Sequence, residues 1–275
     1  MTKVVLIGAG GKMGCRLTNN LKKSAYSMSY VEVGLEGIER LTELGVTVSN
    51  VGDVVPDADM IILAVPDVLL GKISADVIPN MKSGAIIIFL DPAVAMAKKH
   101  FHRDDISYFI THPTHPSVFN WESTPEAQAD YFGGVLAKQS VVCALLHGNE
   151  DDYEVGEKLA IAMYGPIVKS YKITIEQMAL LEPALVETLA SSCLAIIKEG
   201  MDEVVKKGVP QDAARAFLLG HLNVQLAIIF GEVPGAAFSD AAYVALARGK
   251  RTIFQQNWKK VFDADDVLEQ VNEIT

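Results

Sequence analysis

Residues 4–14 read VVLIGAGGKMG, an apolar run that passes directly into four glycines. The short, β-branched run predicts a buried parallel strand, and Leu17 and Leu21 then have the spacing of the inner face of a helix. Glycines at a strand–turn–helix junction let backbone amides approach a diphosphate, which the helix N-terminus also attracts. The stretch therefore predicts a dinucleotide-binding turn made by Gly8, Ala9, Gly10, Gly11, Lys12, Met13 and Gly14.

An acidic residue follows at about the distance that such a turn requires. A second strand is expected over 30–33, and Glu32 lies 18 positions after Gly14. A carboxylate at this place accepts hydrogen bonds from ribose hydroxyls. The next residues, Val33, Gly34 and Leu35, offer no cation to a 2′-phosphate, so the sequence predicts NAD rather than NADP as cofactor.

Strands alternate with helical stretches through the first half of the chain. Further strands are expected over 46–48, 60–65, 84–90, 106–111 and 141–146. This alternation predicts an α/β fold with a Rossmann-type, doubly wound, mostly parallel sheet, which we expect to occupy residues 1–150. Since ligands bind at the carboxyl ends of such strands, Ala64, Val65 and Pro66 are expected beside the cofactor.

The sequence His-Pro-Thr-His-Pro after the sixth strand offers catalytic chemistry. His112 and His115 are three positions apart, and the prolines restrict the loop that carries them. Either imidazole could take a hydroxyl proton while hydride leaves the carbon, or the pair could hold a divalent metal together with carboxylates. A third interpretation is that both histidines only stabilise the loop.

Residues 151–275 predict an all-α domain. A helix expected over 173–207 is apolar on more than one face, which indicates that partners cover it on several sides. We therefore expect a helical domain for substrate binding and dimerisation, and a homodimer. Two carboxylates in this helix, Glu182 and Glu187, could converge with His115 from the first domain. Glu182 would then be a catalytic residue, and His115, Glu182 and Glu187 would be metal ligands. Alternatively, the two carboxylates contact only solvent and their own helix.

Composition and charge exclude several classes of protein. The 275 residues carry a net charge of −10 without a basic stripe, which argues against a nucleic-acid partner. The three cysteines form no C-x-x-C pair, and the N-terminus shows no secretory leader. No uncharged apolar run reaches 18 residues, so no membrane span is expected, and we expect a cytoplasmic location.

The glycine turn, Glu32, Ala64-Val65-Pro66 and the long helix together resemble the 6-phosphogluconate dehydrogenase and β-hydroxyacid dehydrogenase superfamily over the whole chain. Members typically carry a G-x-G-x-x-x-K-x-x-x-N signature with a catalytic lysine. Residues 164–172 lack its glycines and its asparagine, so no catalytic role passes to Lys169 or Lys172.

The His-Pro-Thr-His-Pro loop and residues 238–240 and 254–262 resemble a smaller branch that includes the D-apionate oxidoisomerases. This resemblance implies NAD-dependent oxidation of a CH–OH group in a small anionic sugar acid, coupled to an isomerisation. Ketol-acid reductoisomerase chemistry is similar and implies metal-bound carboxylates. The alternatives are a dehydrogenase of another small β-hydroxyacid and an NAD-binding sensor without catalysis.

Overall fold

The computed structural model describes residues 1–275, which form two compact units. The first comprises Met1–Pro183 and Leu268–Thr275, and the second comprises Ala184–Val267. The first unit extends past residue 150, where the sequence analysis placed the boundary, because α7 (Glu150–Tyr164) packs on the sheet and β7 (Ile167–Lys172) pairs with it. That residues 1–150 bind NAD and residues 151–275 bind substrate and dimerise stays a prediction.

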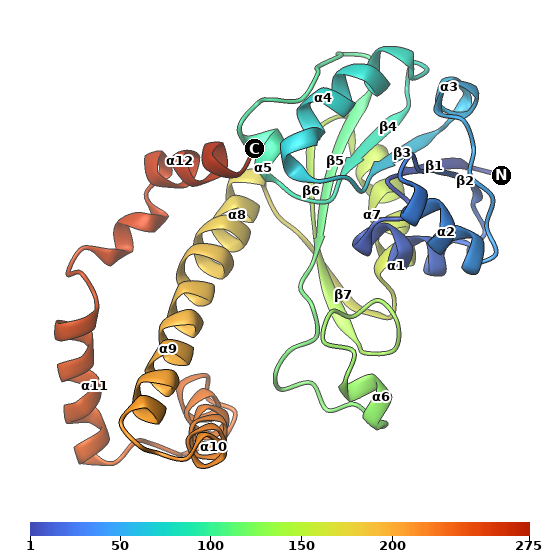
Figure 1. Ribbon diagram of the computed structural model, residues 1–275. Helices are drawn as coiled ribbons and strands as arrows, with labels where there is room; N and C mark the ends of the chain where they lie inside the picture. Colours follow the sequence, from blue (N-terminus) through green and yellow to red (C-terminus); the bar gives the residue numbers. More distant parts are fainter. The chain divides into compact units, whose positions relative to one another are not determined.

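The first unit is built on a seven-stranded sheet with the order β2-β1-β3-β4-β5-β6-β7 (Figure 1). All neighbours are parallel except β5 and β6. This arrangement confirms the predicted Rossmann-type fold class. The strands before β7 are β1 (Lys3–Ile7), β2 (Ser27–Val31), β3 (Met60–Leu63), β4 (Ile86–Phe89), β5 (Ser107–Pro113) and β6 (Gln139–His147).

Apolar side chains alternate between the two faces of these strands, so each face has its own core. Val4, Leu6, Ile62 and Ile88 belong to the core on one face, and Val5, Ile61, Ile87 and their neighbours to the other. Helices α1 (Lys12–Leu21), α2 (Leu35–Glu43) and α7 contribute to the first core. The second is completed by α3 (Val51–Val54), η1 (Val55–Asp57), α4 (Asp67–Val77), η2 (Ile78–Asn80), α5 (Ala93–Met96) and α8 (Ile175–Ala179).

The observed strands differ from the expected ones in three places. The second lies over 27–31 rather than 30–33, because it continues back to pair with Lys3 of β1. The expected strand 46–48 is reduced to a single bridge between Tyr30 and Val48. The strand β7 was not expected, because residues 167–172 alternate too weakly between buried and exposed positions to be recognised.

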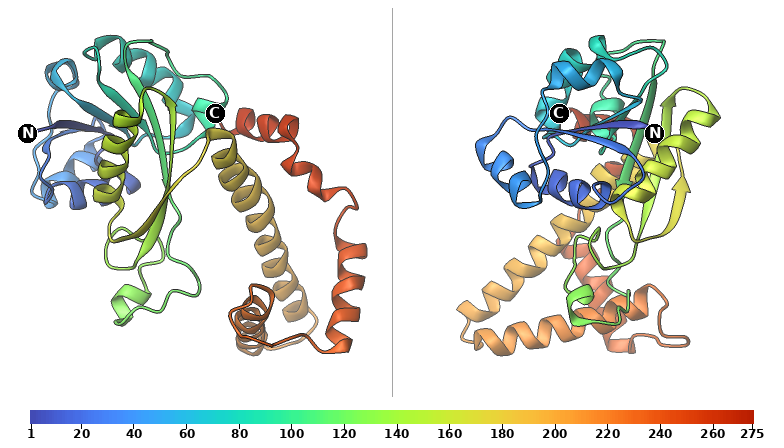
Figure 2. Two further views of the ribbon diagram at one scale, coloured as in Figure 1. Left: turned by 180° about the vertical axis from the view of Figure 1, so that it is seen from behind. Right: turned by 90° about the vertical axis from the view of Figure 1, so that its right-hand side faces the viewer.

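A long segment connects the antiparallel strands β5 and β6. It leaves the carboxyl end of β5 and returns to the amino end of β6, and it contains the short helix α6 (Pro125–Gln128) (Figure 2). The carboxylate of Asp130 accepts hydrogen bonds from the amides of Val135, Leu136 and Ala137. Glu122 accepts another from the amide of Lys138, so the segment is held by its own hydrogen bonds.

The expected long helix is present but not uniform. It runs from α8 through the π-helical segment η3 (Leu180–Ser191) into α9 (Ser192–Lys206). By length and composition, Ile175–Lys206 could cross a membrane, with a mean hydropathy of 1.6 over 18 residues. Pro183 lies inside η3, where the wide turns accommodate a residue that lacks an amide hydrogen.

The second unit consists of helices that bury little of their apolar surface within it. After α9 come α10 (Gln211–Ile229), α11 (Asp240–Ile253), η4 (Trp258–Phe262) and the beginning of α12 (Ala264–Ile274), whose end belongs to the first unit. Helices α9 and α10 contact each other. Neither α9 nor α11 contains a buried residue, so the apolar faces predicted from the sequence remain open in the single chain.

Candidate functional site

The glycine turn lies where β1 and β3 end side by side. Ile7 pairs with Leu63, and the order of strands reverses here, because β2 and β3 flank β1 on opposite sides. Such a switch point is the usual ligand crevice of an open α/β sheet. A Cβ at Gly8 would lie 2.3 Å from the carbonyl oxygen of Ala64, so the two strand ends touch. The structure therefore places the predicted Ala64-Val65-Pro66 turn directly beside the predicted fingerprint.

Close packing explains three of the four glycines. A Cβ at Gly10 would lie 2.4 Å from the carbonyl oxygen of Gly37, and one at Gly14 would lie 2.0 Å from that of Gly8. Gly8 also has a φ of +79°, which side chains disfavour. Gly11 is less crowded, since its nearest atom to an added Cβ is 3.3 Å away.

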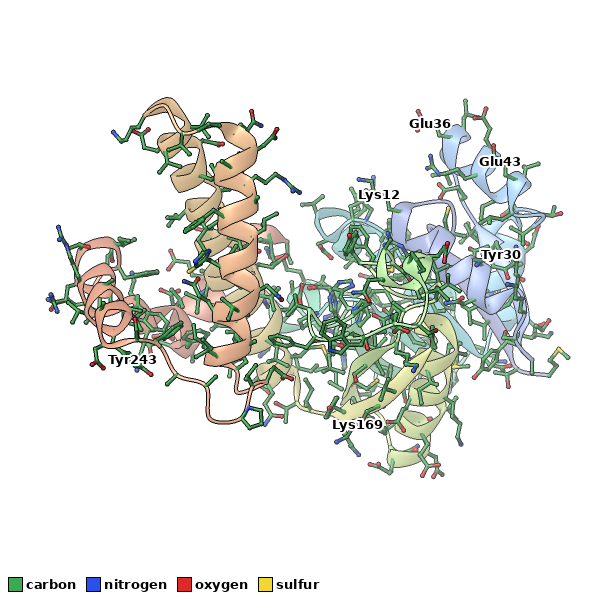
Figure 3. The ribbon with its side chains drawn as sticks, turned by 90° about the horizontal axis from the view of Figure 1, so that it is seen from below. Lys12, Tyr30, Glu36, Glu43, Lys169 and Tyr243 are labelled. Atoms are coloured by element: carbon green, nitrogen blue, oxygen red, sulfur yellow. The ribbon has the colours of Figure 1, made fainter.

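The beginning of α1 suits a bound diphosphate. Lys12 opens this helix and is labelled in Figure 3, and no acidic residue lies in the first turn. The amides of Lys12, Met13 and Gly14 form no hydrogen bond within the protein. Free amides at the positive end of a helix bind phosphate oxygens. The residues present thus fit the diphosphate of a dinucleotide.

Glu32 lies against this turn. Its Oε2 accepts a hydrogen bond of 2.9 Å from the amide of Gly10, and its Oε1 accepts bonds from the amides of Val33 and Gly34. The carboxylate is therefore held at the end of β2, next to the place where a diphosphate would bind. Its contact with the ribose hydroxyls stays a prediction.

A second group of polar residues occupies the same edge of the sheet. Asp91 follows β4, His112 lies near the end of β5, and Glu182 belongs to η3. Their ligand atoms all lie within 4.8 Å of one another. His112 Nε2 is 3.5 Å from Glu182 Oε2, and the two side chains are 19% and 20% exposed. Two carboxylates and an imidazole at these distances are a donor set that can hold a divalent cation.

The electrostatics of this cluster favour a bound cation. Burial, opposed by a hydrogen bond from the Ala93 amide and reinforced by the charge of Asp67, raises the pKa of Asp91 to about 6. Burial also raises the pKa of Asp67, which opens α4. No Lys or Arg forms an ion pair with Asp67, Asp91 or Glu182. A positive ion would therefore relieve the mutual repulsion of half-buried carboxylates.

The two histidines have different surroundings. His112 Nδ1 is 2.8 Å from the carbonyl oxygen of Leu90, and because a carbonyl only accepts, Nδ1 carries the hydrogen. Nε2 is thus the ring nitrogen that faces the cluster. His115 Nδ1 donates in the same way to the carbonyl of Phe132, 2.8 Å away. The two rings are perpendicular, with centroids 6.1 Å apart.

His115 has an unusual backbone conformation. Its φ of +57° is in the left-handed region, which costs a non-glycine residue of the order of 1–2 kcal/mol. Such strain tends to persist where surrounding contacts fix a residue for a function. His115 lies beside the cluster but outside its ligand set, and Glu187 belongs to the second unit. Within the first unit the structure gathers Glu182 with His112 and Asp91, and the metal set of His115, Glu182 and Glu187 stays a prediction.

Comparisons with known proteins cover the whole chain. Residues 120–275 match the family model described as phosphogluconate dehydrogenase (decarboxylating) C-term, and residues 1–116 match the acetohydroxy acid isomeroreductase NADPH-binding domain. The D-apionate oxidoisomerase of Cupriavidus necator is 47% identical over 274 residues, 99% of each chain. That of Rhizobium rhizogenes is 44% identical over the full length of both chains. The chain belongs to the D-apionate oxidoisomerase family.

Solved structures agree with this membership. A protein from Cupriavidus necator, described as a semialdehyde dehydrogenase NAD-binding protein in complex with calcium and NAD, is 47% identical and superimposes with a TM-score of 0.98 over the full length of both chains. A ketol-acid reductoisomerase from an uncultured archean shares the fold at 18% identity, with a TM-score of 0.71 over 99% of this chain and 82% of the other.

Family membership confirms several predictions. The match to D-apionate oxidoisomerases over the full chain confirms the predicted superfamily branch and an NAD-dependent oxidoreductase. One member of the candidate site was missed by sequence reasoning. Asp91 comes two positions after the buried strand β4, where ligand-binding residues of parallel sheets often lie, and this position was the available signal.

The contacts of Glu32 lead to a prediction about which nicotinamide cofactor this protein prefers. Glu32→Gln should weaken NAD binding about 10- to 100-fold, because charged hydrogen bonds to the ribose and to the Gly10 amide both become weaker. NADP should bind the wild type far more weakly than NAD, and the ratio should shrink in the variant. Titration calorimetry with both nucleotides measures this. Tighter binding of NADP than of NAD by the wild type would contradict the prediction.

Proposed function

We propose that the protein oxidises D-apionate with NAD and couples this oxidation to an isomerisation, using a divalent cation held by Asp91, His112 and Glu182. The observation that carries the proposal is the common location of two sites. The glycine turn at β1 and the acidic cluster at β4 and β5 occupy the same edge of one sheet. The relatives that share the full chain are D-apionate oxidoisomerases.

The donor set indicates which cations to test. Carboxylates suit Mg²⁺, Mn²⁺ and Ca²⁺, whereas an imidazole adds affinity for Mn²⁺ and Zn²⁺. A bound cation would polarise a substrate oxygen as a Lewis acid. The residues of the chain do the rest: Asp91 and Glu182 supply negative charge, and the bond from His112 Nδ1 to Leu90 keeps its Nε2 directed at the cluster.

His115 is the residue best suited to move a proton. Because Nδ1 donates to the carbonyl of Phe132, neutral His115 has a lone pair only on Nε2, and no residue of the cluster uses it. We propose that His115 Nε2 accepts the proton of the substrate hydroxyl, whereas His112 serves as a ligand of the cation. Bound NAD supplies the acceptor for the hydride that leaves the same carbon.

The second unit supports a homodimer. An apolar groove of about 670 Å³ lies on it, lined by residues of α9 and α10 that include Met201, Val204 and Phe217. Leu194, Ile196 and Phe217 are 59%, 47% and 70% exposed. Apolar surface of this extent is normally covered. We propose that a second copy of the chain covers this groove. Light scattering on the purified protein measures whether it is a dimer. We also propose a cytoplasmic location.

The proposal is tested by NADH formation on a panel of sugar acids. The wild type should reduce NAD with D-apionate, lose this activity to a chelator and regain it with Mn²⁺ or Mg²⁺. His115→Asn should lower kcat by about 10²–10⁴-fold with unchanged NAD affinity. His102→Asn, at a histidine that pairs with Asp104 away from the cluster, is the matched control. NAD binding without turnover of any acid would instead favour a sensor.

A further inference from the structure

The candidate site poses an electrostatic problem for an acid substrate. Asp67, Asp91 and Glu182 are three carboxylates at one edge of the sheet, with no Lys or Arg paired to any of them. A single divalent cation neutralises only two of these charges. The carboxylate of a sugar acid therefore needs a separate cationic side chain, and this requirement rests on the function proposed above.

Arg16 meets the requirement among the arginines of the first unit. Arg40 donates to the carbonyl of Gly10 and lies 3.7 Å from Glu36, and Arg103 pairs with Asp105. Arg16 has neither a carboxylate nor a carbonyl partner. It belongs to α1, one turn after Lys12, and helical side chains lean toward the N-terminus of their helix. That end of α1 is the end at the ligand crevice.

An aromatic ring holds the guanidinium in place. The Cζ atom of Arg16 lies 4.3 Å from the centroid of the Phe132 ring. A guanidinium in such contact keeps its N–H groups available for a bidentate carboxylate contact, and less conformational entropy is lost on binding. Asn20, one turn further along α1, donates to the carbonyl of Gly134, which fixes the segment that carries Phe132 against the same helix.

The same phenylalanine joins Arg16 to the proposed base. The carbonyl of Phe132 accepts the hydrogen bond from His115 Nδ1, and the rings of Phe132 and His115 are perpendicular with centroids 6.2 Å apart. Its ring faces the guanidinium while its backbone fixes the imidazole. One residue therefore sets the positions of a cation and of a proton acceptor, the two groups that an acid with a reacting hydroxyl requires.

We propose that Arg16 binds the carboxylate of the sugar-acid substrate and that Phe132 positions it for this contact. The rival assignment is a contact with the cofactor diphosphate, since α1 begins at the turn that would bind it. The two assignments differ in what a variant loses. A substrate contact affects the KM for the acid, and a diphosphate contact affects the affinity for NAD.

The central experiment compares Arg16→Gln with the wild type. The variant should show a KM for D-apionate about 10- to 100-fold higher, with NAD affinity within twofold, because a charge-assisted bidentate contact is lost. Millimolar guanidinium should restore part of the activity, which it would not do for a folding defect. Phe132→Leu should raise the KM by a few fold, since it removes the ring but keeps the carbonyl that holds His115.

Two controls separate charge from structure. Lys23→Gln removes a cation just beyond the other end of α1, and we expect its kinetics to match the wild type. Binding of D-apionate and of its neutral amide, measured by calorimetry in the presence of NADH, should differ strongly in the wild type and little in Arg16→Gln. This binding readout does not need turnover.

The outcomes distinguish the inference from the function on which it rests. A normal KM for D-apionate in Arg16→Gln, or a loss of NAD affinity with an unchanged KM, overturns the role of Arg16. The proposed function still holds in that case, provided that the wild type oxidises D-apionate. If the wild type does not oxidise D-apionate, the proposed function falls. In that case equal binding of sugar acids by wild type and Arg16→Gln overturns the inference as well, and weaker binding by the variant sustains it.

Discussion

Replacing Gly14 with alanine should abolish NAD binding. The added Cβ would lie 2.0 Å from the carbonyl oxygen of Gly8 and 2.7 Å from backbone atoms of Ala9, so α1 must move away from the turn. Since the first-turn amides of α1 are the groups that fit the diphosphate, we expect at least a 100-fold loss of affinity. Overpacking of this kind should also lower the free energy of unfolding by about 1–3 kcal/mol.

The measurement combines NAD titration calorimetry with urea unfolding. Gly52→Ala is the matched control, because a Cβ there would have Asn50 Oδ1 at 3.4 Å as its nearest atom, an ordinary contact. The control should bind NAD normally. Wild-type NAD affinity in the Gly14→Ala protein would show that the cofactor does not depend on the tight approach of α1 to β1.

The second large effect is expected from Glu182→Gln. The substitution keeps the shape of the side chain but removes one of the two carboxylate ligands that, with His112, lie within 4.8 Å of one another. Polarisation by a cation contributes several kcal/mol, and each 1.36 kcal/mol is a factor of ten in rate, so kcat/KM should fall by about 10³-fold. Asp91→Asn should behave in the same way.

A thermal-shift titration gives an independent readout. Mn²⁺ should raise the Tm of the wild type, because a ligand that binds only the native state stabilises it, and this increase should disappear in Glu182→Gln. Glu154→Gln serves as the control, since Glu154 lies 3.8 Å from Lys158 in a surface pair that contributes little. A Glu182→Gln protein that keeps both its activity and the Mn²⁺-induced shift would rule out the metal site.

The predictable part of the structure is the part encoded locally. Residues 4–14 contain a strand, a glycine turn and the beginning of a helix within eleven positions, so periodicity and glycine spacing suffice. The start of α7 is also encoded locally, because the side chain of Asn149 provides an N-cap. Family resemblance then supplied the reaction class.

The composition of the acidic cluster depends on contacts between residues far apart in sequence. Asp91 and His112 meet because β4 pairs with β5, and Glu182 reaches them 70 positions later through η3. Sequence reasoning grouped Glu187 with Glu182 because both lie in the expected long helix, and it did not include Asp91. The wide π-helical turns that change the direction of these side chains have no sequence pattern recognisable in one chain.

The antiparallel pairing of β5 with β6 has an evolutionary consequence. Because the segment 114–138 begins and ends at the same rim, where the Thr114 amide bonds to the Ser140 carbonyl, its length can change without shifting any strand. The segment carries the proposed base His115 near its start and Phe132 near its end, so the residues between these two form an exchangeable cassette. Descendants of an ancestral enzyme could acquire new acids by replacing this cassette alone, leaving the nucleotide-holding framework untouched.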